Sequence, residues 1–93
     1  MKKLENLRNI KTEVNKMDFN YKNTHRIMYL VYRSKQLFED SGPIPNKDIA
    51  LHQTNKLIEV ELMELINSDS EKEVKKAFDE VVDNFKIVLD YIA

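Results

Sequence analysis

The sequence contains no cysteine, and it has only one glycine and two prolines in 93 residues. Without cysteine the chain forms no disulfide and offers no thiolate ligand or cysteine nucleophile, which fits the reducing cytoplasm. The single glycine, Gly42, excludes phosphate-binding loops that need several glycines, namely the nucleotide P-loop and the dinucleotide-binding fingerprint. Several common enzyme classes are therefore excluded by composition.

A long hydrophobic run is also missing. The longest apolar stretch, from Ile27 to Tyr32, has six residues, whereas a helix that spans a bilayer needs about 20. Near the start of the chain, Glu5 and Arg8 occupy positions where the apolar stretch of a secretion signal would begin. We expect a cytoplasmic protein without a membrane span or a signal peptide.

Charges of opposite sign dominate the two halves of the chain, although the net charge is only −1. Residues 1–38 contain nine basic and three acidic side chains, a net charge of +6. Residues 39–93 contain six basic and thirteen acidic side chains, a net charge of −7. Such an asymmetry either pairs the two halves within the fold or presents surfaces of opposite sign to partners. The sequence leaves both alternatives open.

The sequence shows helical periodicity of its apolar residues over most of its length. Apolar residues recur at helical spacing in residues 4–17, 27–38, 49–66 and 74–92. The last segment has the most regular pattern, a coiled-coil-like seam. Its members are Val74, Phe78, Val81, Phe85, Val88 and Ile92. The pattern predicts an all-α protein, in which residues 1–93 form a single antiparallel bundle of about four helices.

Turn-forming residues indicate where the first helices end. Residues 18–24 are rich in side chains that favour caps and turns, and they predict a loop. Gly42 and Pro43 predict a sharp corner after the second helix, because proline cannot continue a helix. We expect Asn46 to be the N-cap of the third helix.

The remaining boundaries follow from polar residues in the second half of the chain. The polar tract at residues 52–56 predicts that the first half of the third helix is less buried than its second half. Two overlapping capping boxes, Ser68 with Glu71 and Ser70 with Glu73, predict the start of the fourth helix.

Candidate catalytic and metal-binding residues are few. His25 and His52 are the only histidines, and neither follows a glutamate by three positions, which is the spacing found in di-iron bundles. The four serines have no positional relation to a histidine that would indicate a nucleophile and its base. We therefore expect no enzymatic activity, no catalytic residue, no metal and no cofactor.

Binding through helix faces is the function that remains. The second helix interleaves basic and aromatic side chains, and large aromatic residues dominate interface energies. Phe78 and Phe85 are either anchors of this kind or core residues. Paired carboxylates on later helices indicate either solvated faces of amphipathic helices or an acidic docking surface. We expect another protein as the partner, without identifying it, bound through Tyr29, Tyr32, Arg26, Arg33, Glu61, Glu64, Asp79 and Asp83.

Two alternative functions remain open. The basic residues and tyrosines of the N-terminal half are a mixture that can hold phosphates and stack bases, which would suit a nucleic-acid-binding accessory protein. The slightly acidic net charge counts against this alternative. The other alternative is a structural homo-oligomer, for example a homodimer, that covers apolar helix surface with a second copy of the chain.

In size, charge and helix count the chain resembles the bacteriocin immunity proteins of Gram-positive bacteria. These are four-helix bundles that work from the cytoplasmic side of the membrane. The resemblance concerns architecture and assigns no functional residue. It implies that the protein partner is met in an immunity, inhibitor or regulatory role.

Overall fold

The computed structural model describes residues 2–92 as four helical segments joined by short connections. They are α1 (Lys2–Asn15), α2 (Tyr21–Asp40), a continuous helix of residues 47–66, and α5 (Glu71–Asp90). The third segment, here called the α3–α4 helix, consists of α3 (Lys47–Leu57), the π-helical turn η1 (Ile58–Leu62) and α4 (Met63–Ile66). Residues 2–92 contain no strand, so the predicted all-α bundle of about four helices is confirmed.

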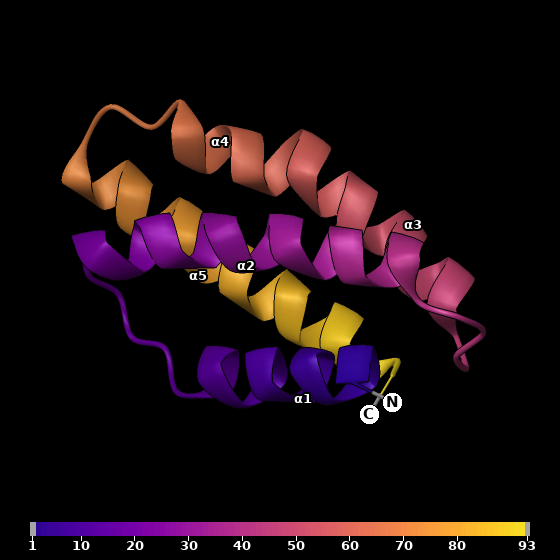
Figure 1. Cartoon of the computed structure of the whole chain (residues 1–93). Helices are drawn as coiled ribbons and strands as arrows, with labels where there is room; N and C mark the ends of the chain where they lie inside the picture. Colours follow the sequence, from indigo (N-terminus) through magenta and orange to yellow (C-terminus); the bar gives the residue numbers. More distant parts are fainter. Residues whose placement is uncertain (1, 93) are drawn as a thin grey trace.

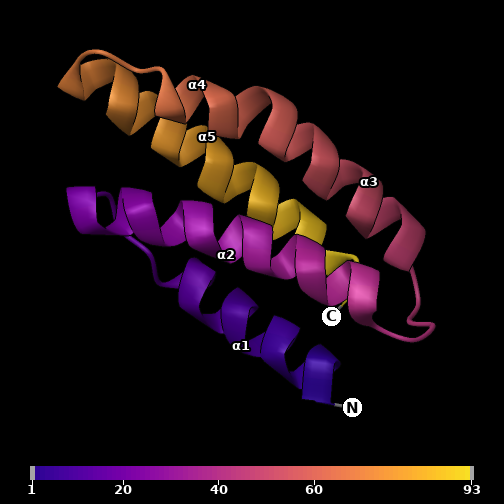
Figure 2. The same cartoon turned by 45° about the horizontal axis from the view of Figure 1, so that its top comes forward.

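The four segments alternate in direction and form an elongated body of 41 × 23 × 17 Å. Figure 2 shows α2 and α5 in the middle, with α1 on one side and the α3–α4 helix on the other. Both outer segments pack against α2 and α5, and each helix runs antiparallel to its neighbours in the chain (Figure 1). The predicted antiparallel arrangement is therefore present.

Buried apolar side chains from every segment form one continuous core. Its largest fully buried members are Phe38, Phe78 and Phe85. The predicted seam of α5 faces this core throughout, with only Val74 partly exposed. Since Phe78 and Phe85 are almost completely inaccessible, they are core residues in this fold rather than anchors for a partner.

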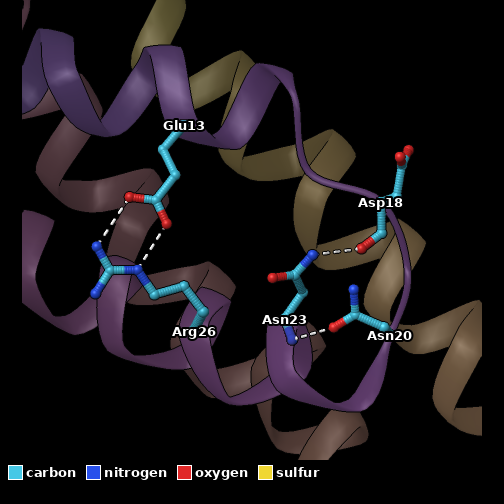
Figure 3. Close-up of polar contacts among 5 residues, drawn as sticks. All are labelled: Glu13, Asp18, Asn20, Asn23 and Arg26. Carbon is cyan, nitrogen blue, oxygen red and sulfur yellow. Dashed lines mark hydrogen bonds and ion pairs between the residues drawn. The ribbon is translucent and has the colours of Figure 1, made fainter.

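The connection between α1 and α2 is shorter than predicted. Asn20 has an extended backbone, and its side-chain oxygen accepts a hydrogen bond from the backbone N–H of Asn23 at 2.7 Å. The Asn23 side chain in turn donates to the carbonyl of Asp18 at 2.7 Å (Figure 3). Because this N-cap starts α2 at Tyr21, the loop predicted for residues 18–24 is wrong in its second half.

Asn46 is at the predicted N-cap position, but its side chain makes no cap hydrogen bond. Its backbone is left-handed, with φ at 63°, and the side-chain amide instead donates to the carbonyl of Tyr91 at 2.8 Å. The capping part of the prediction is therefore wrong. Asn46 fixes the end of α5 to the corner before α3.

Only one of the two predicted capping boxes corresponds to a cap. The Ser70 hydroxyl accepts from the backbone N–H of Glu73 at 3.2 Å, and Ser70 has the extended backbone that an N-cap needs. The Ser68 hydroxyl instead donates to the carbonyl of Glu64 at 2.7 Å, at the end of the preceding helix. The prediction for Ser68 with Glu71 is wrong because Ser68 still belongs to that helix end.

A step of five residues between core positions explains the π-helical turn. The buried positions of the α3–α4 helix are Ala50, Thr54, Leu57, Leu62 and Leu65. In a regular α-helix, five residues correspond to a rotation that ends about 140° from the starting face. The wider turn of η1 absorbs one extra residue and so returns Leu62 to the core.

The same turn places several apolar side chains outside the core. Val60, Met63 and Ile66 are each roughly half exposed, whereas Thr54 in the polar tract is fully buried. The Thr54 hydroxyl donates to the carbonyl of Ala50 at 2.7 Å, which satisfies it inside the core. Two residues of the first half, residues 47–56, and three of the second half, residues 57–66, are buried, so the predicted difference in burial between the halves is small.

Ser34 and Ser70 offer a test of the same substitution in opposite environments. Ser34 is fully buried in α2, and its hydroxyl has no hydrogen-bond partner among residues 2–92. We expect Ser34→Ala to raise the free energy of unfolding by about 1 kcal/mol, because it removes an unsatisfied polar group and improves helix propensity. Ser70→Ala is expected to lower it by about 1 kcal/mol, because the cap is lost.

Urea unfolding of both variants, followed by circular dichroism, measures whether the free energy of unfolding rises in Ser34→Ala and falls in Ser70→Ala. A loss of stability in Ser34→Ala as large as that in Ser70→Ala would show that the Ser34 hydroxyl is satisfied in solution.

Candidate functional site

The two histidines lie on the surface, and they are not part of a ligand cluster. His25 and His52 are both exposed. Within residues 2–92, no group of three or more histidine, aspartate or glutamate side chains is arranged to hold a metal ion. No helix in this part of the chain is both long and apolar enough to cross a membrane.

Most charges of the two halves face solvent rather than each other. Three ion pairs join side chains within residues 2–92, and only Lys11 with Asp90, at 3.0 Å, connects the basic half to the acidic half. The others, Glu13 with Arg26 and Lys75 with Asp79, lie within one half. The charge asymmetry of the sequence is therefore present on the surface.

Three of the predicted binding residues meet in a shallow hollow between α1 and α2. Arg26, Tyr29 and Arg33 line it together with Glu13. The Arg26 guanidinium donates to both carboxylate oxygens of Glu13, at 2.6 and 2.9 Å (Figure 3), and lies 5.3 Å from the centre of the Tyr29 ring. Tyr32 is exposed but does not line this hollow. The positive charge of Arg26 is thus already paired.

The ion pair between Glu13 and Arg26 makes stability depend on pH. Hydrogen bonds from the guanidinium lower the pKa of Glu13 and raise the pKa of Arg26. Because the pKa of Glu13 is lower in the folded than in the unfolded state, the ion pair contributes to folding stability. This contribution is complete above the unfolded-state pKa of about 4.3, and it is lost as pH falls through the folded-state pKa. Since both side chains are more than a third exposed, we expect less than about 1 kcal/mol.

Comparison of Glu13→Gln with the parent chain by urea unfolding from neutral to acidic pH checks this expectation. The stability difference should be present at neutral pH and shrink to nothing in acid. A difference that is unchanged in acid would mean that the carboxylate charge is not its source.

The predicted acidic residues fall into two separate places. Asp79 and Asp83 lie on an outer strip of α5, where they and Glu80 follow the three lysines Lys72, Lys75 and Lys76. Glu61 and Glu64 instead line two adjoining hollows between the α3–α4 helix and α5. The structure therefore does not bring the four carboxylates together.

These two hollows share Val60, and together they form what we call the α4–α5 groove. Four exposed apolar side chains line it: Val60 and Met63 from the α3–α4 helix, Ile87 from the second half of α5, and Tyr91 directly after α5. Their exposed fractions are 51%, 44%, 55% and 37%, respectively. No other hollow described on residues 2–92 gathers as many exposed apolar side chains.

Carboxylates gather mainly at the end of this apolar strip that holds Val60 and Met63. Five acidic side chains line the groove against two basic ones, Lys56 and Lys76, which gives a local net charge of −3 at neutral pH. The side-chain amide of Asn84 donates to Glu61 at 3.3 Å and so connects the two walls. The acidic lining consists of Glu59, Glu61, Glu64, Glu73 and Glu80.

Sequence reasoning identified Glu61 and Glu64 but missed the apolar members of the groove. Val60 and Met63 belong to a segment with more apolar residues than one helix face can bury, and this excess was a usable signal. Ile87 and Tyr91 fall outside the regular seam of α5, which predicts exposure. Comparison of the chain with protein-family models, curated proteins and solved structures finds no match.

Proposed function

We propose that this chain is a non-enzymatic, cytoplasmic protein that acts by binding another protein through the α4–α5 groove. The observation that supports the proposal is the gathering of Val60, Met63, Ile87 and Tyr91, all exposed, along two adjoining hollows. Exposed apolar residues are common singly, but a group of them rimmed by polar side chains is typical of an interaction surface.

The size of the strip sets what it contributes to binding. Complete burial of a large apolar side chain stabilises by about 1.5–3 kcal/mol, and these four side chains are already about half buried. Covering them would therefore contribute roughly 3–6 kcal/mol before association costs. A micromolar complex needs about 8 kcal/mol, so polar and charged contacts around the strip must add to it.

Site-specific photo-crosslinking tests this proposal. A benzoylphenylalanine placed at Met63 in the native host is expected to form a discrete covalent adduct with another polypeptide. The same residue at Tyr29, which lines the α1–α2 hollow and is 56% exposed against 44% for Met63, serves as the control. Adducts at Tyr29 alone would place the interface on α2, and no adduct at Met63 would contradict the proposal.

The homo-oligomer alternative is tested by the same experiment. An adduct at Met63 with twice the mass of the chain would identify a second copy as the occupant of the groove. The nucleic-acid alternative has less support because Arg26 is already paired with Glu13. Titration with single-stranded and duplex nucleic acid at low salt tests it, since phosphate binding weakens steeply as salt rises.

The same proposal includes the effect of binding: the chain inhibits, neutralises or regulates the protein that it binds. Its support is the architectural likeness to bacteriocin immunity proteins described above. If the role is immunity, expression of the chain in a sensitive strain is expected to protect against a toxin encoded beside it. Lack of protection would remove the immunity role and leave protein binding in place.

A further inference from the structure

We propose that the occupant of the α4–α5 groove is a basic amphipathic helix of another protein. This inference rests on the proposed function and specifies the chemistry of the partner. The shape of the groove, its charge and the burial of the apolar stripes of the chain's own basic helices support it.

The shape of the groove suits a helix. Along α5 the lining extends from Glu73 to Tyr91, a distance of about 27 Å, which matches a helix of about 18 residues. The walls are the α3–α4 helix and α5, two antiparallel helices that α2 covers from the other side (Figure 2). A second helix lying over the same pair would repeat, on the outside, the packing that α2 makes on the inside.

The charge of the groove determines the polar face of that helix. Glu59 and Glu64 on one wall and Glu73 and Glu80 on the other flank the end of the strip that holds Val60 and Met63. An apolar stripe in the partner would cover Val60, Met63 and the α5 residues, and lysine or arginine on each side of it would meet the carboxylates. Phosphate groups of a nucleic acid or an anionic membrane would be repelled by the same rim.

A second folded copy of the chain does not offer such a helix. Its basic amphipathic helices are α1 and α2, and their apolar stripes are already in the core, through Leu7, Ile10 and Val14 of α1 and through Ile27, Leu30 and Leu37 of α2. Presenting either stripe to another copy would require that helix to leave its own bundle. A different polypeptide is therefore the occupant that the structure favours.

The probe for the test is a synthetic helical peptide of about 18 residues with leucine on one face and lysine on the other. A matched peptide carries glutamate in place of every lysine. Binding is measured by fluorescence anisotropy at an ionic strength of about 0.15 M, where charges beyond about 8 Å are screened. The lysine peptide is expected to bind the parent chain, and the glutamate peptide is not.

Two double variants with the same change in net charge locate the site. Glu64→Lys with Glu80→Lys reverses charge on both walls of the groove and should weaken lysine-peptide binding by about tenfold or more. Glu5→Lys with Glu39→Lys reverses two exposed charges on α1 and α2 and should leave the affinity within about threefold of the parent value. Thermal unfolding confirms that each variant remains folded.

Several outcomes would overturn the inference. They are no binding of the lysine peptide, equal binding of both peptides, or equal weakening by the two double variants. The crosslinking experiment separates this failure from failure of the proposed function. If Met63 forms its adduct while the lysine peptide neither binds nor competes, the groove binds a protein whose docking segment is not a basic helix.

Discussion

Phe85→Ala is expected to lower the free energy of unfolding by about 3–5 kcal/mol. The Phe85 side chain is fully buried, and it lies in the middle of the α5 seam that contacts the whole core. Alanine would remove most of the ring's apolar area and leave a cavity that the surrounding helices fill only in part. For a chain of this length the total stability is roughly 5–14 kcal/mol, so a large fraction would be lost.

Equilibrium unfolding in urea, followed by far-ultraviolet circular dichroism, measures this effect. Phe19→Ala is the matched control, because Phe19 lies in the α1–α2 connection and is only partly buried, with an edge contact to Phe78. The free energy of unfolding should fall clearly less in Phe19→Ala than in Phe85→Ala. Equal losses in the two variants would mean that Phe85 is not as enclosed in solution as the structure indicates.

Deletion of a single residue is expected to have opposite consequences in η1 and in α5. Removing Val60 shortens the step from Leu57 to Leu62 to four residues, so a regular α-helix would bury both. The connection after α4 has to absorb a shift of about 1.5 Å. We expect the chain without Val60 to remain folded, with helix content close to that of the parent.

Removing Glu80 from α5 has no such compensation. Every residue after the deletion would turn by about 100° relative to the core, so the buried positions from Val81 to Leu89 would lose their orientation. We expect a loss of more than about 4 kcal/mol or complete unfolding. Circular dichroism and urea unfolding compare the two deletions, and equal damage by both would contradict the explanation given for η1.

The sequence predicted most reliably those elements in which every local signal agrees. In α5 the spacing, the Ser70 cap and the charges on the outer face all indicate one helix in one orientation, and the structure confirms its core face. The bundle architecture followed from four such segments. Predictions failed where a polar side chain had several possible partners, as Asn46 and Ser68 show.

The α3–α4 helix was the least predictable element. Counting apolar residues places its core in the second half, but a helix buries one face, and which face depends on its neighbours. Thr54 is buried because its hydroxyl bonds to the preceding turn, an option that polarity alone does not reveal. The groove was therefore only partly predicted. Two of its five carboxylates, Glu61 and Glu64, were identified, but the exposure of Val60 and Met63 follows from a π-helical turn that depends on the tertiary contacts.

The order of the helices around the bundle also determines which part of the chain opens most easily. Each helical segment packs against the one before it in the chain. The first segment, α1, also packs against the last, α5, and Lys11 forms an ion pair with Asp90 there. Of the residues of α1, only Leu7, Ile10 and Val14 are buried, fewer than in α2 or α5. Local unfolding begins in segments with few buried apolar contacts. We therefore expect α1 to unfold separately, at a lower free energy than the rest of the bundle, and its backbone amide hydrogens to exchange with solvent sooner than those of α5.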